Sequence, residues 1–162
     1  MELWDLYNKD GQLTNETVVR GQTLPPNRYH LVIHFWIRNS KGEYFIQKRS
    51  NKVTSKVGIW AFTGGSVLKG ENSLQGLQRE VQEEIGYTLN PEEVKKIYQY
   101  YGNNYKVDVY VLQKDVPLNA FYLGDEVEEI TYATPTQITQ LQKQGKFWDL
   151  DDTYMKTLFG VY

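Results

Sequence analysis

Three glutamates, Glu80, Glu83 and Glu84, lie within five residues of one another, in the stretch from Gly65 to Tyr87. On a helix this spacing places them on one face, where like charges repel and disfavour the isolated helix. An acidic face in contact with solvent is one interpretation of the cluster. The other is a site for a divalent cation, because hard cations such as Mg²⁺ prefer oxygen ligands.

A glycine-containing loop precedes these glutamates. Gly64, Gly65 and Gly70 allow the backbone to approach a ligand closely. Glu71 and Arg79 have opposite charges, and we expect an ion pair between them that ties the loop to the following helix. The loop and the carboxylates together favour a cation and phosphate site over a solvated acidic face.

The glutamates require a helix to position them. Asn72 is a suitable N-cap and Gln75 can complete a capping box, while Gly86 suits the C-terminal end. These signals predict a helix over residues 72–85. Apolar residues at helical spacing predict its buried face: Leu74, Leu77, Val81 and Ile85.

The remaining elements are mostly strands, recognised by runs of β-branched and aromatic residues. We predict strands over 30–38, 43–49, 59–65, 95–101, 105–113 and 128–134, and C-terminal helices over 135–144 and 149–160. Turn residues at 39–42 predict a hairpin between the first two strands. This order of elements predicts an α/β or α+β sandwich.

The whole chain has the composition of one globular domain, residues 1–162. Its net charge of −2 gives no strong nucleic-acid signal. Without cysteine it can have no disulfide and no thiolate site, which fits a reducing cytoplasm. The N-terminus does not have the pattern of a signal peptide, and the longest apolar run is too short to span a membrane. We therefore expect a cytoplasmic protein.

The stretch 65–87 resembles the box of the Nudix hydrolases, G-x5-E-x7-R-E-U-x-E-E-x-G-U, where U is a bulky aliphatic residue. Every fixed position is filled, by Gly65, Glu71, Arg79, Glu80, Glu83, Glu84 and Gly86. Val81 fills the first U, and Tyr87 replaces the aliphatic residue at the last.

The resemblance implies a Nudix-type α/β/α sandwich with a central mixed sheet. It also implies hydrolysis by water of a diphosphate linkage, in a nucleoside diphosphate joined to another group X, with Mg²⁺ or Mn²⁺. By position, Glu80, Glu83 and Glu84 would be metal ligands, and the Gly64 carbonyl a further one. One carboxylate can instead act as general base, and the sequence leaves open which.

Segments outside the box resemble the branch that includes isopentenyl-diphosphate isomerases and related hydrolases. They are NRYHLVIHFWI, QKRS and DEVEEITYAT. Those isomerases use a cysteine, which this chain lacks, so we do not expect isomerase activity by that mechanism. The branch binds diphosphate with an arginine and a lysine before the box, and Arg49 and Lys52 match them. Exposure to solvent is the alternative role for both.

Family members often use another glutamate beyond the box, as ligand or base. Glu126 is the candidate, with Asp125 and Glu128 as rivals and an exposed acidic loop as the alternative. His30 and His34 share one face of a predicted strand, where we expect them to pack or form hydrogen bonds rather than bind metal.

Two functions remain open from the sequence. One is a Nudix hydrolase that acts on a small, nucleotide-derived diphosphate. The other is a regulatory module of the same fold that binds such a compound without cleaving it. A homodimer is compatible with the resemblance, and the sequence does not identify X.

Overall fold

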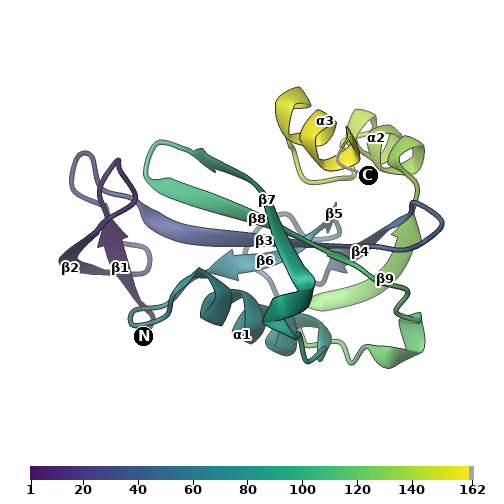
Figure 1. Ribbon diagram of the computed structural model, residues 1–162, viewed down its shortest axis with the longest axis horizontal. Coiled ribbons are helices and arrows are strands. Elements are labelled where there is room, and N and C mark those ends of the chain that lie inside the picture. Colours follow the sequence, from purple (N-terminus) through teal and green to yellow (C-terminus); the bar gives the residue numbers. More distant parts are fainter. Residues whose placement is uncertain (161–162) are drawn as a thin grey trace.

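A mixed β-sheet lies between helices in the computed structural model, which describes residues 1–160 (Figure 1). Helix α1 (Ser73–Ile85) covers one face of the sheet, and α2 (Pro135–Lys143) and α3 (Asp152–Gly160) cover the other. Two short 3-10 helices, η1 (Pro91–Glu93) and η2 (Leu118–Ala120), lie in connections. The predicted sandwich with a central mixed sheet is confirmed.

The sheet is ordered β5-β4-β3-β8-β7, with β6 paired to β3 and β9 paired to β4. Its strands are β3 (His30–Arg38), β4 (Tyr44–Arg49), β5 (Trp60–Ala61), β6 (Thr63–Ser66), β7 (Val94–Tyr101), β8 (Tyr105–Gln113) and β9 (Val127–Ala133). Strand β3 is the centre, parallel to β8 along its whole length and antiparallel to β6. Parallel pairing buries both faces of β3, which explains its nearly continuous apolar sequence.

The predicted hairpin between 30–38 and 43–49 is only partly correct. Both strands form, but they pair only beside the turn, at Arg38 and Tyr44. Beyond that point β5 pairs with this edge of β4 and β6 pairs with β3. Strand β9 pairs with the other edge of β4 along its whole length. The predicted strand 59–65 is accordingly divided into β5 and β6.

Helix α1 begins and ends where its caps predict. Asn72 and Gln75 form the capping box, and Gly86 adopts the left-handed conformation at φ 61°. Leu77, Val81 and Ile85 are fully buried. Leu74 is 38% exposed, so its assignment to the core was wrong. It lies in the first turn, where side chains lean toward the N-terminus and away from the sheet.

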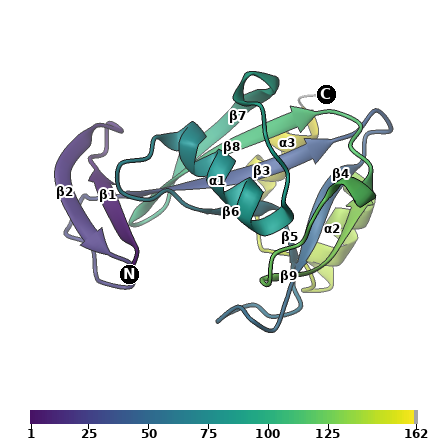
Figure 2. The ribbon, with the colours of Figure 1, turned by 90° about the horizontal axis from the view of Figure 1, so that it is seen from below.

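An N-terminal hairpin was not predicted. It consists of β1 (Leu3–Tyr7) and β2 (Leu13–Val19), and Figure 2 shows it beyond one end of the sheet. A small cluster of Trp4, Leu6 and Val18 holds it together. Backbone hydrogen bonds join it to Tyr29 and Lys69.

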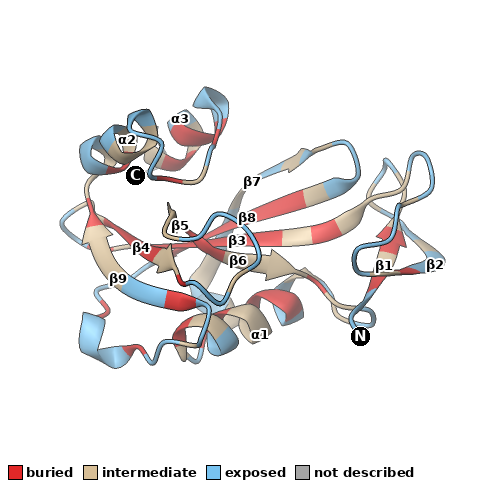
Figure 3. Ribbon diagram, turned by 180° about the vertical axis from the view of Figure 1, so that it is seen from behind, coloured by how far each residue is buried: buried red, intermediate tan, exposed pale blue. Residues whose placement is uncertain are grey.

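The core has one layer on each face of the sheet, and Figure 3 shows the buried residues along the central strands and the inner faces of the helices. In residues 1–160, the helices are all too short or too polar to cross a membrane.

Candidate active site

A cleft of about 730 Å³ lies where α1, β4, β6 and the 50–58 segment meet. It brings together all the residues predicted to bind the cation and the diphosphate: Arg49, Lys52, Gly64, Glu80, Glu83, Glu84 and Glu126. Asp125 and Glu128 are not among its lining residues, and Glu128 lies 3.5 Å from Lys48 instead. An apolar groove of about 420 Å³ between β9 and α2 has no charged side chain among the described residues that line it.

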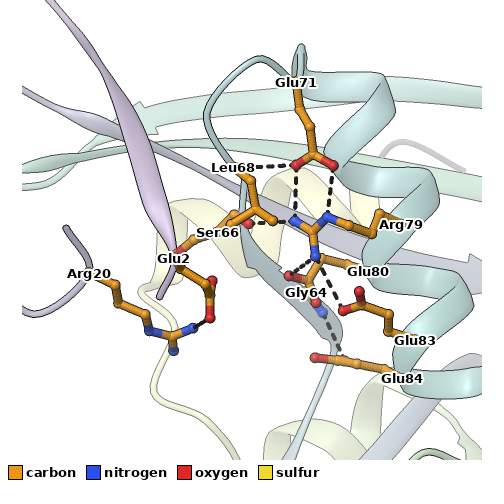
Figure 4. A network of polar contacts seen from close by, with 10 residues as sticks. All are labelled: Glu2, Arg20, Gly64, Ser66, Leu68, Glu71, Arg79, Glu80, Glu83 and Glu84. Atoms are coloured by element: carbon orange, nitrogen blue, oxygen red, sulfur yellow. Dashed lines mark hydrogen bonds and ion pairs between the residues drawn. The ribbon is translucent and has the colours of Figure 1, made fainter. Parts of the chain in front are cut away.

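The Glu71 carboxylate and the Arg79 guanidinium form a bidentate ion pair, drawn in Figure 4. The two N–O distances are 2.7 and 3.1 Å. Arg79 also donates to the Ser66 carbonyl, and Glu71 accepts from the Leu68 backbone N–H. The pair therefore connects the loop 66–71 to α1. Burial raises the pKa of Glu71, but the hydrogen bonds from Arg79 and Leu68 outweigh it and lower the pKa overall.

Arg79 also contacts two of the three clustered glutamates. Its Nη1 lies 3.0 Å from Glu80 Oε1 and 3.2 Å from Glu83 Oε2. Within residues 1–160, no three His, Cys, Asp or Glu side chains are grouped so that they could hold a metal ion as they stand. Two of the three clustered carboxylates, those of Glu80 and Glu83, are held by Arg79 in place of a cation.

Glu84 is held by a different set of donors. Gln47 Nε2 donates to Glu84 Oε2 at 2.8 Å, and the backbone N–H of Gly64 donates to the same oxygen at 3.4 Å. The Thr63 hydroxyl donates to Gln47 Oε1 at 2.7 Å, which orients the amide. Both of these donors bind Oε2, so Glu84 Oε1 is available to a ligand in the cleft.

Burial raises the pKa of Glu84 to about 8 and that of Glu80 to about 7. The charge of Glu80 raises the pKa of Glu84 further, while Arg79 partly offsets the effect of burial on Glu80. The surroundings of both carboxylates therefore carry too little positive charge to favour their ionisation at neutral pH. A divalent cation would supply it, so the donor set fits a cation in chemistry and charge.

Gly65 allows this packing, because a Cβ at that position would meet the Glu80 carboxylate. Gly64 has a similar constraint, since a Cβ there would meet the Ile33 carbonyl across the β3–β6 pair. Gly65 therefore lets the Glu80 carboxylate approach the backbone of β6, and Gly64 lets β6 lie close to β3.

Basic and aromatic side chains line the part of the cleft formed by the 50–58 segment. The Arg49 guanidinium donates twice to the Ser55 carbonyl and lies 5.2 Å from the centre of the Trp148 ring. Lys56 lies 4.3 Å from the same ring. Lys52 also lines the cleft. Arg49 therefore helps to hold this segment in addition to facing the cleft.

Both histidines pack against aromatic rings, and His34 also forms a hydrogen bond, in line with the expectation. His30 stacks on Trp4 with ring centres 3.9 Å apart. His34 stacks on Phe62 at 3.8 Å, and its Nδ1 lies 2.9 Å from the Tyr154 hydroxyl. Burial lowers the pKa of His34 to about 3, so its imidazole is neutral at any ordinary pH.

Sequence reasoning missed several residues that line the cleft, Glu2, Arg20, Gln47 and Trp148, and the buried Thr63 that orients Gln47. Gln47 is only 5% exposed, but little in the sequence indicated this because Lys48 and Arg49 follow it in β4. Glu2 and Arg20 belong to the N-terminal region that sequence reasoning left without structure. Nothing in the sequence around Trp148 indicates that it reaches the cleft.

Comparisons with known proteins agree with the fold and the box. The family model for the NUDIX domain matches residues 28–155. Uncharacterised Nudix hydrolases of Listeria innocua and Listeria monocytogenes are 36% and 37% identical over 149 residues, which is 91% of this chain and 88% of each relative. DR0079 from Deinococcus radiodurans has a similar fold, with a TM-score of 0.78 at 19% identity, covering 99% of this chain and 100% of that one. The chain therefore belongs to the Nudix family of hydrolases.

Proposed function

We propose that the cleft hydrolyses the diphosphate linkage of a small nucleoside diphosphate joined to a group X, with Mg²⁺ or Mn²⁺. The observation that carries this proposal is the pair of buried carboxylates, Glu80 and Glu84, whose pKa values are raised to about 7 and 8. Structural ion pairs lower a carboxylate pKa, whereas a raised value beside an open cleft is typical of a functional site.

Glu80, Glu83, Glu84 and the Gly64 carbonyl would hold the cation. Arg79 must then share or release its contacts with Glu80 and Glu83, which are single hydrogen bonds of 3.0 and 3.2 Å. Its bidentate contact with Glu71 can remain throughout. A bound divalent cation neutralises a diphosphate, polarises phosphorus and lowers the pKa of water.

The protein's own side chains supply the remaining steps. Arg49 and Lys52 would bind phosphate oxygens, for which the planar guanidinium has matching geometry. A water molecule attacks phosphorus, the P–O bond of the linkage breaks, and a carboxylate of Glu83, Glu84 or Glu126 accepts the water proton. Gln47 orients the Glu84 carboxylate for either role, ligand or base.

The test is turnover of a panel of diphosphate-linked compounds with Mg²⁺ or Mn²⁺, scored by released phosphate-bearing products. We expect Glu83→Gln and Glu84→Gln to lower turnover at least about a hundredfold, as loss of a positioned proton acceptor or ligand does. Glu129→Gln is the matched control, because Glu129 is exposed on β9 and outside the cleft. Undiminished turnover in both cleft variants would refute the site. Binding without turnover in the wild type would favour the regulatory module.

A further inference from the structure

A buried chain of three polar side chains ends at the cleft. Trp36 Nε1 and His34 Nδ1 each lie 2.9 Å from the Tyr154 hydroxyl oxygen. Indole can only donate, so the Trp36 N–H points at that oxygen. The Tyr154 side chain is enclosed, at 2% exposure, and its hydroxyl proton must therefore find an acceptor within the protein.

Within residues 1–160, His34 Nδ1 is the acceptor that the Tyr154 hydroxyl can reach. If Nδ1 carried the proton instead, the oxygen would receive two N–H donors and the hydroxyl proton would be buried without a partner. That arrangement is strongly disfavoured. Tyr154 thus donates to His34 Nδ1, and the neutral imidazole carries its own proton on Nε2.

The Nε2–H of His34 has no protein partner in the described part of the chain. The buried side-chain atoms without partners there are Trp4 Nε1, His30 Nδ1 and Asp108 Oδ1. His34 Nε2 is not one of them, so it keeps access to open space, and the space that His34 lines is the cleft. The cleft therefore contains a neutral donor whose direction is set by Tyr154.

The surroundings of this donor are aromatic. The His34 ring stacks on Phe62, whose ring centre is 5.9 Å from that of Trp148, and all three line the cleft. His34 is also the β3 partner of Gly64 in the sheet, so the donor lies next to the strand that carries the proposed cation ligand. An aromatic lining with one fixed donor suits a planar ring that has an acceptor atom.

We propose that His34 is a specificity-determining residue: its Nε2–H binds an acceptor atom of a heteroaromatic ring in the substrate, and selects an oxo-bearing ring over its amino-bearing analogue. The inference rests on the proposed function of the cleft and narrows its substrate class. An amino group at the same place would also be a hydrogen-bond donor, so neither it nor the Nε2–H would have an acceptor.

The first experiment measures the tautomer directly. The chain has only two histidines, so ¹⁵N NMR of the labelled full-length protein gives two pairs of imidazole signals, and His30→Gln assigns them. We expect His34 to show a protonated Nε2 and an unprotonated Nδ1. Tyr154→Phe should convert this to a mixture of tautomers. A wild-type His34 protonated on Nδ1 would overturn the proposal, and this result requires no variant to fold.

The second experiment measures selectivity by calorimetry with Mg²⁺ and non-hydrolysable α,β-methylene diphosphates. Inosine against adenosine, and uridine against cytidine, each compare an oxo with an amino group. We expect the oxo member of at least one pair to bind about three- to tenfold tighter, the effect of one neutral hydrogen bond. His34→Phe should remove this preference, and the matched His30→Phe should keep it. Equal affinity within both pairs in the wild type would overturn the proposal.

Failure of this inference is distinguishable from failure of the proposed function. A protein that binds with the expected preference but never cleaves any diphosphate would refute only the hydrolase. Turnover that depends on Glu84, with no oxo preference in the wild type, would refute only the role of His34.

Discussion

Replacing Arg79 with lysine should destabilise the protein although the charge is kept. The guanidinium makes five hydrogen bonds, two to Glu71 and one each to Ser66, Glu80 and Glu83. An ammonium has three N–H donors on a single atom, so at least two of the five must be lost.

The magnitude follows from the exposure of the partners. A hydrogen bond to a charged group contributes about 1.5–3 kcal/mol when it is shielded from water. Glu71 and Glu80 are shielded, with side chains 20% and 14% exposed, whereas Glu83 is 59% exposed and its bond contributes little. If the exposed bond to Glu83 is one of the two that are lost, one shielded bond is lost with it, and Arg79→Lys should lower the free energy of unfolding by about 1.5–3 kcal/mol.

Urea unfolding with a chelator present, followed by the fluorescence of the four tryptophans, measures this loss without a contribution from metal. The midpoint should fall with the m-value unchanged. The control is Arg28→Lys, because Arg28 forms one surface pair, with Glu16 at 2.6 Å. We expect that control to lose less than about 1 kcal/mol. Equal losses of unfolding free energy in the two variants would refute the argument that the planar guanidinium of Arg79 stabilises the loop 66–71.

Three further results are expected. In chelator, thermal stability should fall as pH rises from about 6.5 to about 8, because the folded protein keeps protons on Glu80 and Glu84 that the unfolded chain has released. Below about pH 6.5 the lowered pKa values of His30 and His34 act in the opposite direction and offset this slope. A flat profile above about pH 6.5 would contradict the raised pKa values, and Glu84→Gln should reduce the slope. Added Mg²⁺ should raise the melting temperature more at pH 8 than at pH 5.5, because the carboxylates must be ionised to bind the cation. An equal rise at both pH values would argue against carboxylate ligands. Gly65→Ala should lower turnover by roughly a hundredfold by displacing the Glu80 carboxylate. Gly160→Ala in α3 is the control, because a Cβ there meets nothing within 4 Å and the residue lies outside the cleft.

The local features of the site were predictable from the sequence. The capping box of Asn72 and Gln75 and the C-terminal Gly86 are formed by residues within one turn of each helix end. Interactions of this range depend on neighbouring residues alone, so the sequence predicts them well. The positions of the three glutamates along α1 are predictable for the same reason.

Strand pairing was less predictable. The turn 39–42 indicated a hairpin, and the local signal was correct at Arg38 and Tyr44. The strands that take the place of the hairpin partners, β6 on β3 and β5 on β4, come from later in the chain. Their pairing reflects which apolar faces can be buried together, and a short window of sequence does not contain that information.

Neighbouring residues are enough to show that a carboxylate cluster follows a glycine loop on a capped helix, and hence to indicate the family and the class of chemistry. The environment of those carboxylates depends on contacts between distant parts of the chain. Gln47 reaches Glu84 across 37 positions, and Tyr154 reaches His34 across 120. Burial and hydrogen bonding set the protonation of Glu84 and the tautomer of His34. Both depend on atoms that only folding brings together.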